Sequence, residues 1–113
     1  MNNHDVQKPS IEPLDKANLY LAQIVADRVH GEIKVLTPIN VDMTPDNSRA
    51  PKFFSMIVVT LPIGPIQHEF EIVADSLEAA LDAYADAANQ AGIDFIQGAK
   101  DAALRNSILG AKN

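Results

Sequence analysis

Cysteine is absent from the chain, which excludes disulfide scaffolds and thiolate-based metal or nucleophilic sites. No apolar run approaches the ~20 residues that a helix needs to cross a bilayer. The first five residues, Met1–Asp5, lack the basic and apolar segments of a signal peptide. These absences predict a protein of a reducing, aqueous compartment, most simply the cytoplasm, with no membrane partner.

Motifs that would mark a catalytic, metal or cofactor site are also absent. The histidines His4, His30 and His68 are widely separated, and none has a second metal ligand three or four residues away. His68 lies on the presumed buried parity of its strand, where we interpret it as a hydrogen-bonded core histidine. Nothing selects two carboxylates as an acid–base pair. We therefore expect no metal, no cofactor and no enzymatic activity.

Lysine and arginine are missing from one long stretch. Between Phe53 and Ala99 the chain has seven acids and no base, whereas the remainder has eight acids and nine bases. The net charge of −6 therefore originates in this stretch. Affinity for nucleic acid rests mainly on cationic side chains, so we expect a basic protein partner and no direct nucleic-acid binding. The acids are Glu69, Glu71, Asp75, Glu78, Asp82, Asp86 and Asp94.

The chain does contain enough apolar residues for one core. It has 113 residues, of which 47% are hydrophobic, so a single domain is expected to fold without disulfides. The polar stretch 1–12 is predicted to be a flexible arm. Residues 13–109 are predicted to form one α+β domain, and residues 110–113 a frayed tail.

The first half of the domain changes from helical to strand periodicity. A helix is predicted over 13–30, with Gly31 as its stop. Apolar and polar residues then alternate over 32–43, which predicts a strand. Pro38 cannot donate to a ladder, so this strand is expected to be an edge strand or to carry a bulge. The apolar positions of the helix are Leu14, Ala17, Leu21, Ile24 and Val25.

The second half predicts a hairpin followed by helices. Phe53–Leu61 is apolar on both parities, as in a central strand, and 66–72 alternates after the short turn 62–65. Asp75 is expected to cap a helix that ends at Gly92. Residues 94–109 are interpreted as a third helix, with a short fourth strand near 93–96 as the alternative. The expected fold is α+β, a three-stranded antiparallel sheet with helices on one face, in the order α-β-β-β-α-α.

One face of the predicted hairpin combines apolar and polar strands. Phe54, Met56 and Val58 share a face whose neighbours are polar, including Glu69 and Glu71. Such a stripe indicates a partner-binding or self-association surface with a polar rim. The alternative is that the arm, the 44–52 loop or the last helix covers it.

A row of acids forms the other candidate feature. Glu78, Asp82 and Asp86 are spaced to share one helix face, and Glu69, Glu71 and Asp75 are close in the chain. The row is expected either to steer a basic partner toward the protein or simply to keep a helix face solvated.

Three functional classes follow. The leading expectation is a small acidic protein–protein interaction module, in its narrower form an inhibitor of a basic nucleic-acid-handling protein, as anti-CRISPR and other phage or mobile-element proteins are. The second is a self-associating structural protein with a sheet-face dimer interface. The third is an enzyme or ligand-binding domain with an unrecognised site that includes His68.

Overall fold

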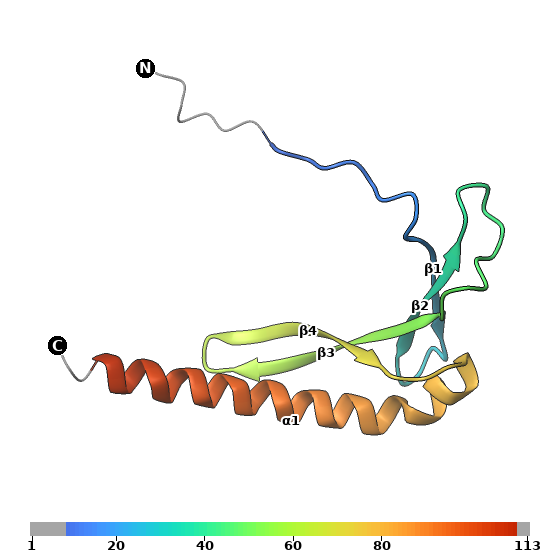
Figure 1. Ribbon diagram of the computed structural model, residues 1–113. Helices are drawn as coiled ribbons and strands as arrows, with labels where there is room; N and C mark the ends of the chain where they lie inside the picture. The colour runs from blue at the N-terminus through green and yellow to red at the C-terminus, as the bar shows by residue number, and fades with distance from the viewer. Residues whose placement is uncertain (1–8, 111–113) are drawn as a thin grey trace, which may run out of the picture.

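A computed structural model describes residues 9–110. Four antiparallel strands are followed by one long helix, and the strands adjoin in sequence order (Figure 1). The α+β class is confirmed, but the order is β-β-β-β-α. Residues 1–8 of the predicted arm and 111–113 of the predicted tail lie outside the described residues. The elements are β1 (Leu19–Ala26), β2 (Glu32–Ile39), β3 (Lys52–Leu61), β4 (Gly64–Ile72) and α1 (Leu77–Gly110).

The predicted first helix over 13–30 is wrong. Its second half forms β1, which pairs along its whole length with β2, from Leu19 opposite Ile39 to Ala26 opposite Glu32. Gly31 therefore belongs to the β1–β2 turn and does not end a helix. A Cβ atom there would collide with the Tyr84 hydroxyl of α1, so the turn needs glycine where it approaches the helix.

Asp27 organises this turn. Its Oδ1 accepts the backbone N–H groups of Val29 at 2.9 Å, His30 at 2.7 Å and Gly31 at 3.3 Å. Its other oxygen, Oδ2, lies 2.7 Å from Nδ1 of His30. These hydrogen bonds, led by the one from the His30 backbone, hold the pKa of Asp27 well below its usual range.

The predicted strand over 32–43 ends earlier, at Ile39, and is not an edge strand. β2 lies between β1 and β3. Its ladder with β3 covers only three pairs, from Lys34 opposite Phe54 to Leu36 opposite Lys52. Pro38 is tolerated because it lies beyond that ladder, where its carbonyl accepts the N–H of Asp46 at 3.0 Å.

The predicted β3–β4 hairpin is confirmed. Nine residue pairs join the strands, from Phe53 opposite Ile72 to Leu61 opposite Gly64, so β4 begins two residues before the predicted 66. Only Pro62 and Ile63 connect the strands. Gly64 has φ of 124°, a conformation that glycine adopts without strain.

The second predicted helix does not stop at Gly92, and neither a third helix nor a strand near 93–96 is present among residues 9–110. One helix of 34 residues, α1, covers both predicted segments. Gly92 costs the helix only about 1 kcal/mol relative to alanine. A Cβ atom there would make only an ordinary contact, 3.7 Å from Cδ1 of Ile57, so packing does not require glycine at this position.

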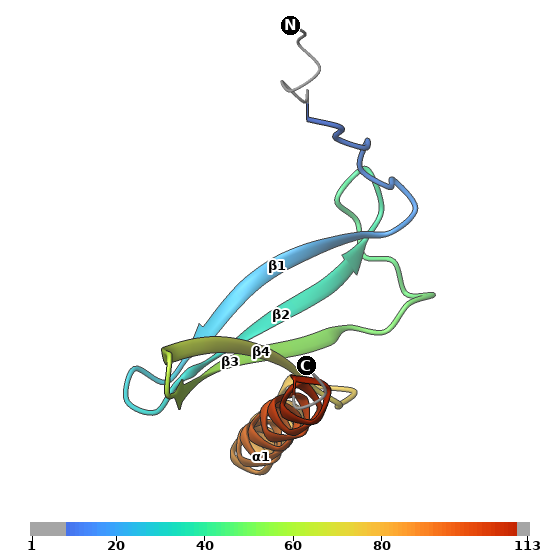
Figure 2. The ribbon, with the colours of Figure 1, turned by 90° about the vertical axis from the view of Figure 1, so that its left-hand side faces the viewer.

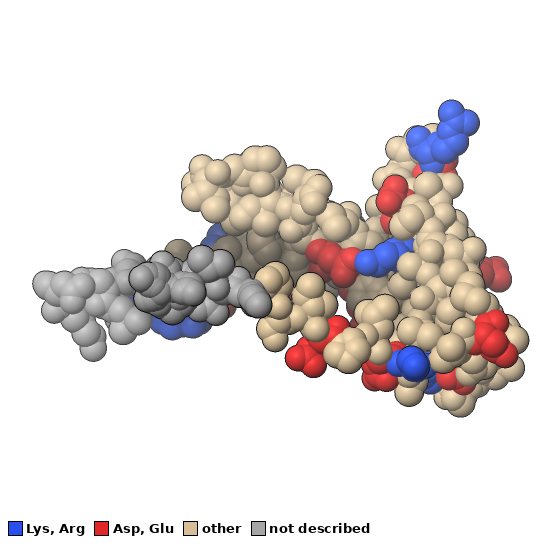
Figure 3. Space-filling view, turned by 90° about the horizontal axis from the view of Figure 1, so that it is seen from above, with Lys and Arg blue, Asp and Glu red and all other residues tan. Residues whose placement is uncertain are grey.

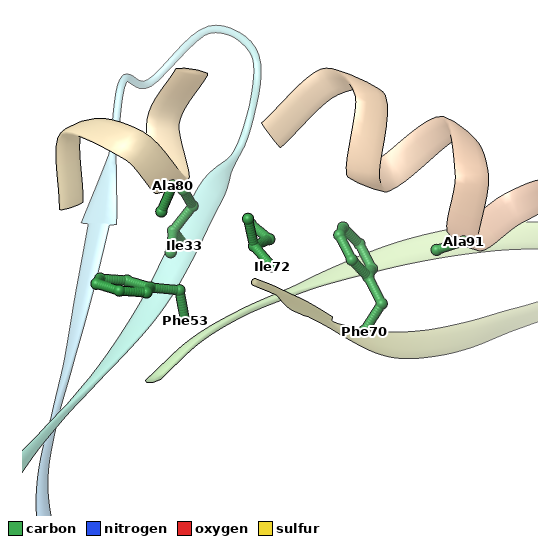
Figure 4. Packing of buried hydrophobic residues seen from close by; sticks show 6 residues of the cluster. All are labelled: Ile33, Phe53, Phe70, Ile72, Ala80 and Ala91. Carbon is green, nitrogen blue, oxygen red and sulfur yellow. The ribbon is translucent and has the colours of Figure 1, made fainter. Parts of the chain in front are cut away.

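The core lies between α1 and one face of the β3–β4 hairpin. Phe53, Phe70 and Ile72 point from the strands toward Ala80 and Ala91 of α1 (Figure 4). Ile33 of β2 completes the buried cluster. Among the described residues no helix lies over the opposite sheet face, and β1 and most of β2 extend away from α1 (Figure 2).

The molecule is extended for its length. Its radius of gyration is 19.7 Å, whereas a compact chain of this length has about 13 Å. The arm at 9–18 and the 40–51 loop stand away from the sheet and contribute to this size (Figure 1). Among the described residues, no helix has a stretch long and apolar enough to cross a bilayer.

Candidate protein-interaction surface

The apolar stripe predicted from the sequence lies on the sheet face that α1 leaves open. Met56 is 49% exposed and Val58 is 62% exposed, while Phe54 is half-buried. The register places Glu71 opposite Phe54 and Glu69 opposite Met56. No described segment covers Met56 and Val58, so the expectation of a covering arm, loop or helix is not met in residues 9–110.

The Lys34 side chain lies over the Phe54 end of this stripe. Its Nζ lies 5.8 Å from the centroid of the Phe54 ring and 2.8 Å from Oε2 of Glu69. Both charged side chains are more than a third exposed, so this ion pair contributes at most about 1 kcal/mol. The Lys34–Glu69 pair covers part of Phe54 and leaves Met56 and Val58, which lie nearer the β3–β4 turn, uncovered.

A shallow groove of 360 Å³ accompanies the stripe. One wall comes from the β3–β4 hairpin, and the other comes from β1 and the β1–β2 turn. The groove is therefore built where the two hairpins diverge. Its principal lining residues are Ile24, Lys34, Phe54, Met56, Val58 and Glu69.

The predicted acidic residues are only partly brought together: Glu71 and Asp86 line one hollow beside β4, whereas the others lie apart from it. Glu69 and Glu71 lie on the open sheet face, whereas Glu78, Asp82 and Asp86 are exposed on α1, in the other layer. On the side opposite α1, acids appear as separate groups, some of them next to Lys or Arg (Figure 3). Only Glu69 and Glu71 share the face of the apolar stripe.

Asp75, the remaining predicted site residue, is exposed in the β4–α1 connection and is not the N-cap. Ser76 has that role, because its Oγ accepts the N–H of Ala79 at 3.1 Å. The N-cap predicted from the sequence, Asp75, is therefore one residue before the actual N-cap, Ser76.

The two histidines in the described residues lie apart, and His68 lines a hollow beside β4 with Glu71, Asp86 and Asp94. His30 is exposed and pairs with Asp27 in the β1–β2 turn. His68 is half-buried, and its ring lies 4.7 Å from that of Phe95. His4 lies outside the described residues. Among the described residues, no cluster of three or more His, Asp or Glu side chains could hold a metal.

Sequence reasoning missed Arg49, which ties the 40–51 loop to the sheet. It donates to Oδ2 of Asp46 at 2.8 Å and to the carbonyl oxygens of Leu19 at 2.8 Å and Ile39 at 3.0 Å. Its guanidinium lies 4.8 Å from the Tyr20 ring centroid. Hydrogen bonds from Ser48 and then Arg49 lower the pKa of Asp46 to about 2. No motif marked these residues, and their role is structural.

Sequence reasoning also missed Ser55, the one buried polar side chain in the described region, at 7% exposure. Its hydroxyl donates to the carbonyl of Glu32 at 2.6 Å. Continued in the same register, the next hydrogen-bonded pair of β2 and β3 would join Glu32 and Met56. The Ser55 hydroxyl occupies the Glu32 carbonyl in place of that pair. The part of β3 from Met56 onward therefore has a partner on the β4 side only.

Comparison with known proteins gives no match: no protein-family model, no curated protein and no solved structure resembles this chain.

Proposed function

We propose that this protein is a protein–protein interaction module that binds a basic partner through the open face of the β3–β4 hairpin. The observation that carries the proposal is the exposure of Met56 and Val58 beside the carboxylates of Glu69 and Glu71. An apolar centre with a polar rim is the usual composition of a binding patch. The cytoplasm remains the compartment in which we expect it to act.

The rim favours a cationic partner. Glu71 forms no ion pair among the described residues, and Glu69 is held by Lys34 alone. A partner presenting arginine or lysine next to an aliphatic side chain would meet Glu71 and Met56 together. The net charge of −6 adds attraction at longer range, although its acids lie in both layers of the fold.

The narrower proposal is an inhibitor of a basic nucleic-acid-handling protein. It rests on the seven acids and absent bases of residues 53–99, which match the charge that a nucleic-acid groove attracts. Such a target would lose its affinity for DNA or RNA when this chain is added, which a mobility-shift assay measures.

A labelled peptide in which arginine alternates with leucine tests the general proposal by fluorescence anisotropy. We expect binding that Met56→Ser weakens about tenfold, because about 50 Å² of apolar contact is lost. Glu71→Gln should weaken binding, and so should salt raised to about 1 M, where the Debye length is about 3 Å.

Matched controls locate the effect. Ile63→Ser removes an equally apolar side chain, 85% exposed at the hairpin turn, and Asp82→Asn removes a carboxylate on α1. Neither should change affinity by more than a small factor. Binding that is insensitive to Met56→Ser would exclude this face as the site. Equal binding of a glutamate–leucine peptide would exclude the preference for a basic partner.

A further inference from the structure

The unpaired edge of β3 has backbone groups free to bond another strand. Pro65 lacks an N–H, so its pair with Thr60 cannot be a hydrogen-bonded one. Because the two kinds of pair alternate along an antiparallel ladder, Met56, Val58 and Thr60 direct their N–H and C=O groups away from β4. Beyond the Ser55–Glu32 bond no described strand lies on that side.

This edge lacks the features that protect edge strands. Residues 56–61 contain no charge and no proline, and five of the six are apolar. The outer edge of β4 is different, since it carries Pro65, Glu69 and Glu71. Natural proteins use proline and charge to prevent strand addition, so β4 is protected and the free part of β3 is not.

The flank of α1 beside this edge is also apolar. Leu81, Ala88, Gly92 and Ile96 recur at spacings that place them along one side of the helix. Leu81 is 51% exposed and Ile96 is 40% exposed. A hollow of 410 Å³ lies between Ala88, Gly92 and Ile96 and residues 57–60 of β3, so strand edge and helix flank form one surface.

Two acids of α1, Asp86 and Asp94, lie on its other flank. They line a hollow beside β4, together with Glu71. The part of α1 beside residues 57–60 of β3, from Ala88 to Ile96, lines the hollow there with uncharged residues only. A like-charged chain can approach that side through uncharged surface.

Exposed apolar side chains are available on this surface. Val58 is 62% exposed, Leu81 is 51% exposed and Ile96 is 40% exposed. A stable interface needs about 800 Å² from each partner, and a contact along both the strand edge and the helix flank would use these side chains together.

We propose that the free edge of β3 and the adjoining flank of α1 form a homodimer interface, in which β3 pairs antiparallel with β3 of a second copy. A two-fold axis at Val59 would place Val58 opposite Thr60 of the other copy and, by symmetry, Thr60 opposite its Val58. These two hydrogen-bonded pairs give about four interstrand bonds. The same axis brings the two helix flanks together, as a closed isologous contact requires.

The outer edge of β1 is also uncharged but is a poorer site. It has no helix over either face, because α1 packs on β3 and β4. A strand added to β1 would gain backbone hydrogen bonds and little apolar burial. A strand added to β3 gains both, because the α1 flank would cover its side chains.

The mass of the full chain in solution, measured by light scattering and sedimentation equilibrium, tests the dimer. We expect twice the 12.2-kDa chain mass. Thr60→Pro should give the single-chain mass, because it removes an N–H that only the second strand would use. Ile96→Asp should do the same by placing a charge in the helix contact. Circular dichroism should show that both variants remain folded.

Two controls match these variants. Thr60→Val keeps the N–H and the β-branched shape, and Leu104→Asp adds the same charge at a site 62% exposed and off the stripe. Both should remain dimeric. A monomeric wild type would overturn the proposal. A mass above that of the dimer would also overturn it. A dimer that persists in Thr60→Pro and Ile96→Asp but dissociates in Phe54→Asp would overturn it too, because the interface would then lie on the sheet face.

Discussion

Single side chains determine where the sheet of this protein stops. The Ser55 hydroxyl ends the β2–β3 ladder by occupying the Glu32 carbonyl. Gly31 and Tyr84 bring the β1–β2 turn against the start of α1. Neither contact follows from a sequence motif, because each joins residues more than twenty positions apart that only the assembled sheet brings together.

Ser55→Ala should lower the free energy of unfolding by about 1 kcal/mol, the usual net value of a hydrogen bond to a partly buried hydroxyl. Urea unfolding followed by circular dichroism measures this change. Ser10→Ala, an exposed control in the arm, should stay within about 0.5 kcal/mol of wild type. Equal stability of the two variants would show that the Ser55 hydroxyl does not stabilise the sheet junction.

At the scale of elements, the sequence predicted the second half of the fold better than the first. The β3–β4 hairpin was predictable because Ile66, Phe70 and Ile72 alternate with polar residues after a short turn. The apolar stripe on its open face followed from the same parity. What the parity could not predict was the separation of Glu71 from Asp82, which depends on α1 packing on the opposite face.

The first element was mispredicted because its local pattern fits two structures. Leu21, Ile24 and Val25 have helical spacing, and much of β1 is exposed on both faces, so no alternation marks it as a strand. Pairing with β2 decides the outcome, as tertiary context often does for strands. Gly92 misled in the opposite direction, because a helix of 34 residues tolerates one glycine at a cost of about 1 kcal/mol.

The two glycines Gly98 and Gly64 should respond to alanine in opposite ways. Gly98 lies inside α1, and a Cβ atom there meets nothing within 4 Å, so Gly98→Ala should raise the free energy of unfolding by about 0.5–1 kcal/mol. Gly64→Ala places a side chain at φ of 124° and should lower it by more than about 1 kcal/mol. Thermal and urea unfolding measure both changes. A destabilising Gly98→Ala would mean that the helix end has an additional neighbour.

At the scale of the whole molecule, few side chains are sealed from water. The buried hydrophobic residues are eight among those described, and six of them form the cluster between α1 and the sheet. Sixteen large hydrophobic side chains remain exposed. Stability of such a chain should therefore depend on association as well as on its own core.

The midpoint of thermal unfolding should rise with protein concentration, because a dimer that dissociates on unfolding is stabilised by mass action. Calorimetry over a hundredfold range of concentration measures the shift. Thr60→Pro is the control, and its midpoint should not change with concentration. A constant midpoint for wild type would mean that unfolding does not involve dissociation.

The β1–β2 and β3–β4 hairpins are joined within the sheet by one short ladder, between β2 and β3. Only three residue pairs join β2 to β3, and Ile33 and the Gly31–Tyr84 contact also hold the β1–β2 hairpin against α1. The groove on the open face has one wall from each hairpin, with Ile24 on the β1–β2 side and Met56 on the β3–β4 side. A molecule bound in this groove would contact both hairpins at once, so binding there should hold the two hairpins in one relative orientation.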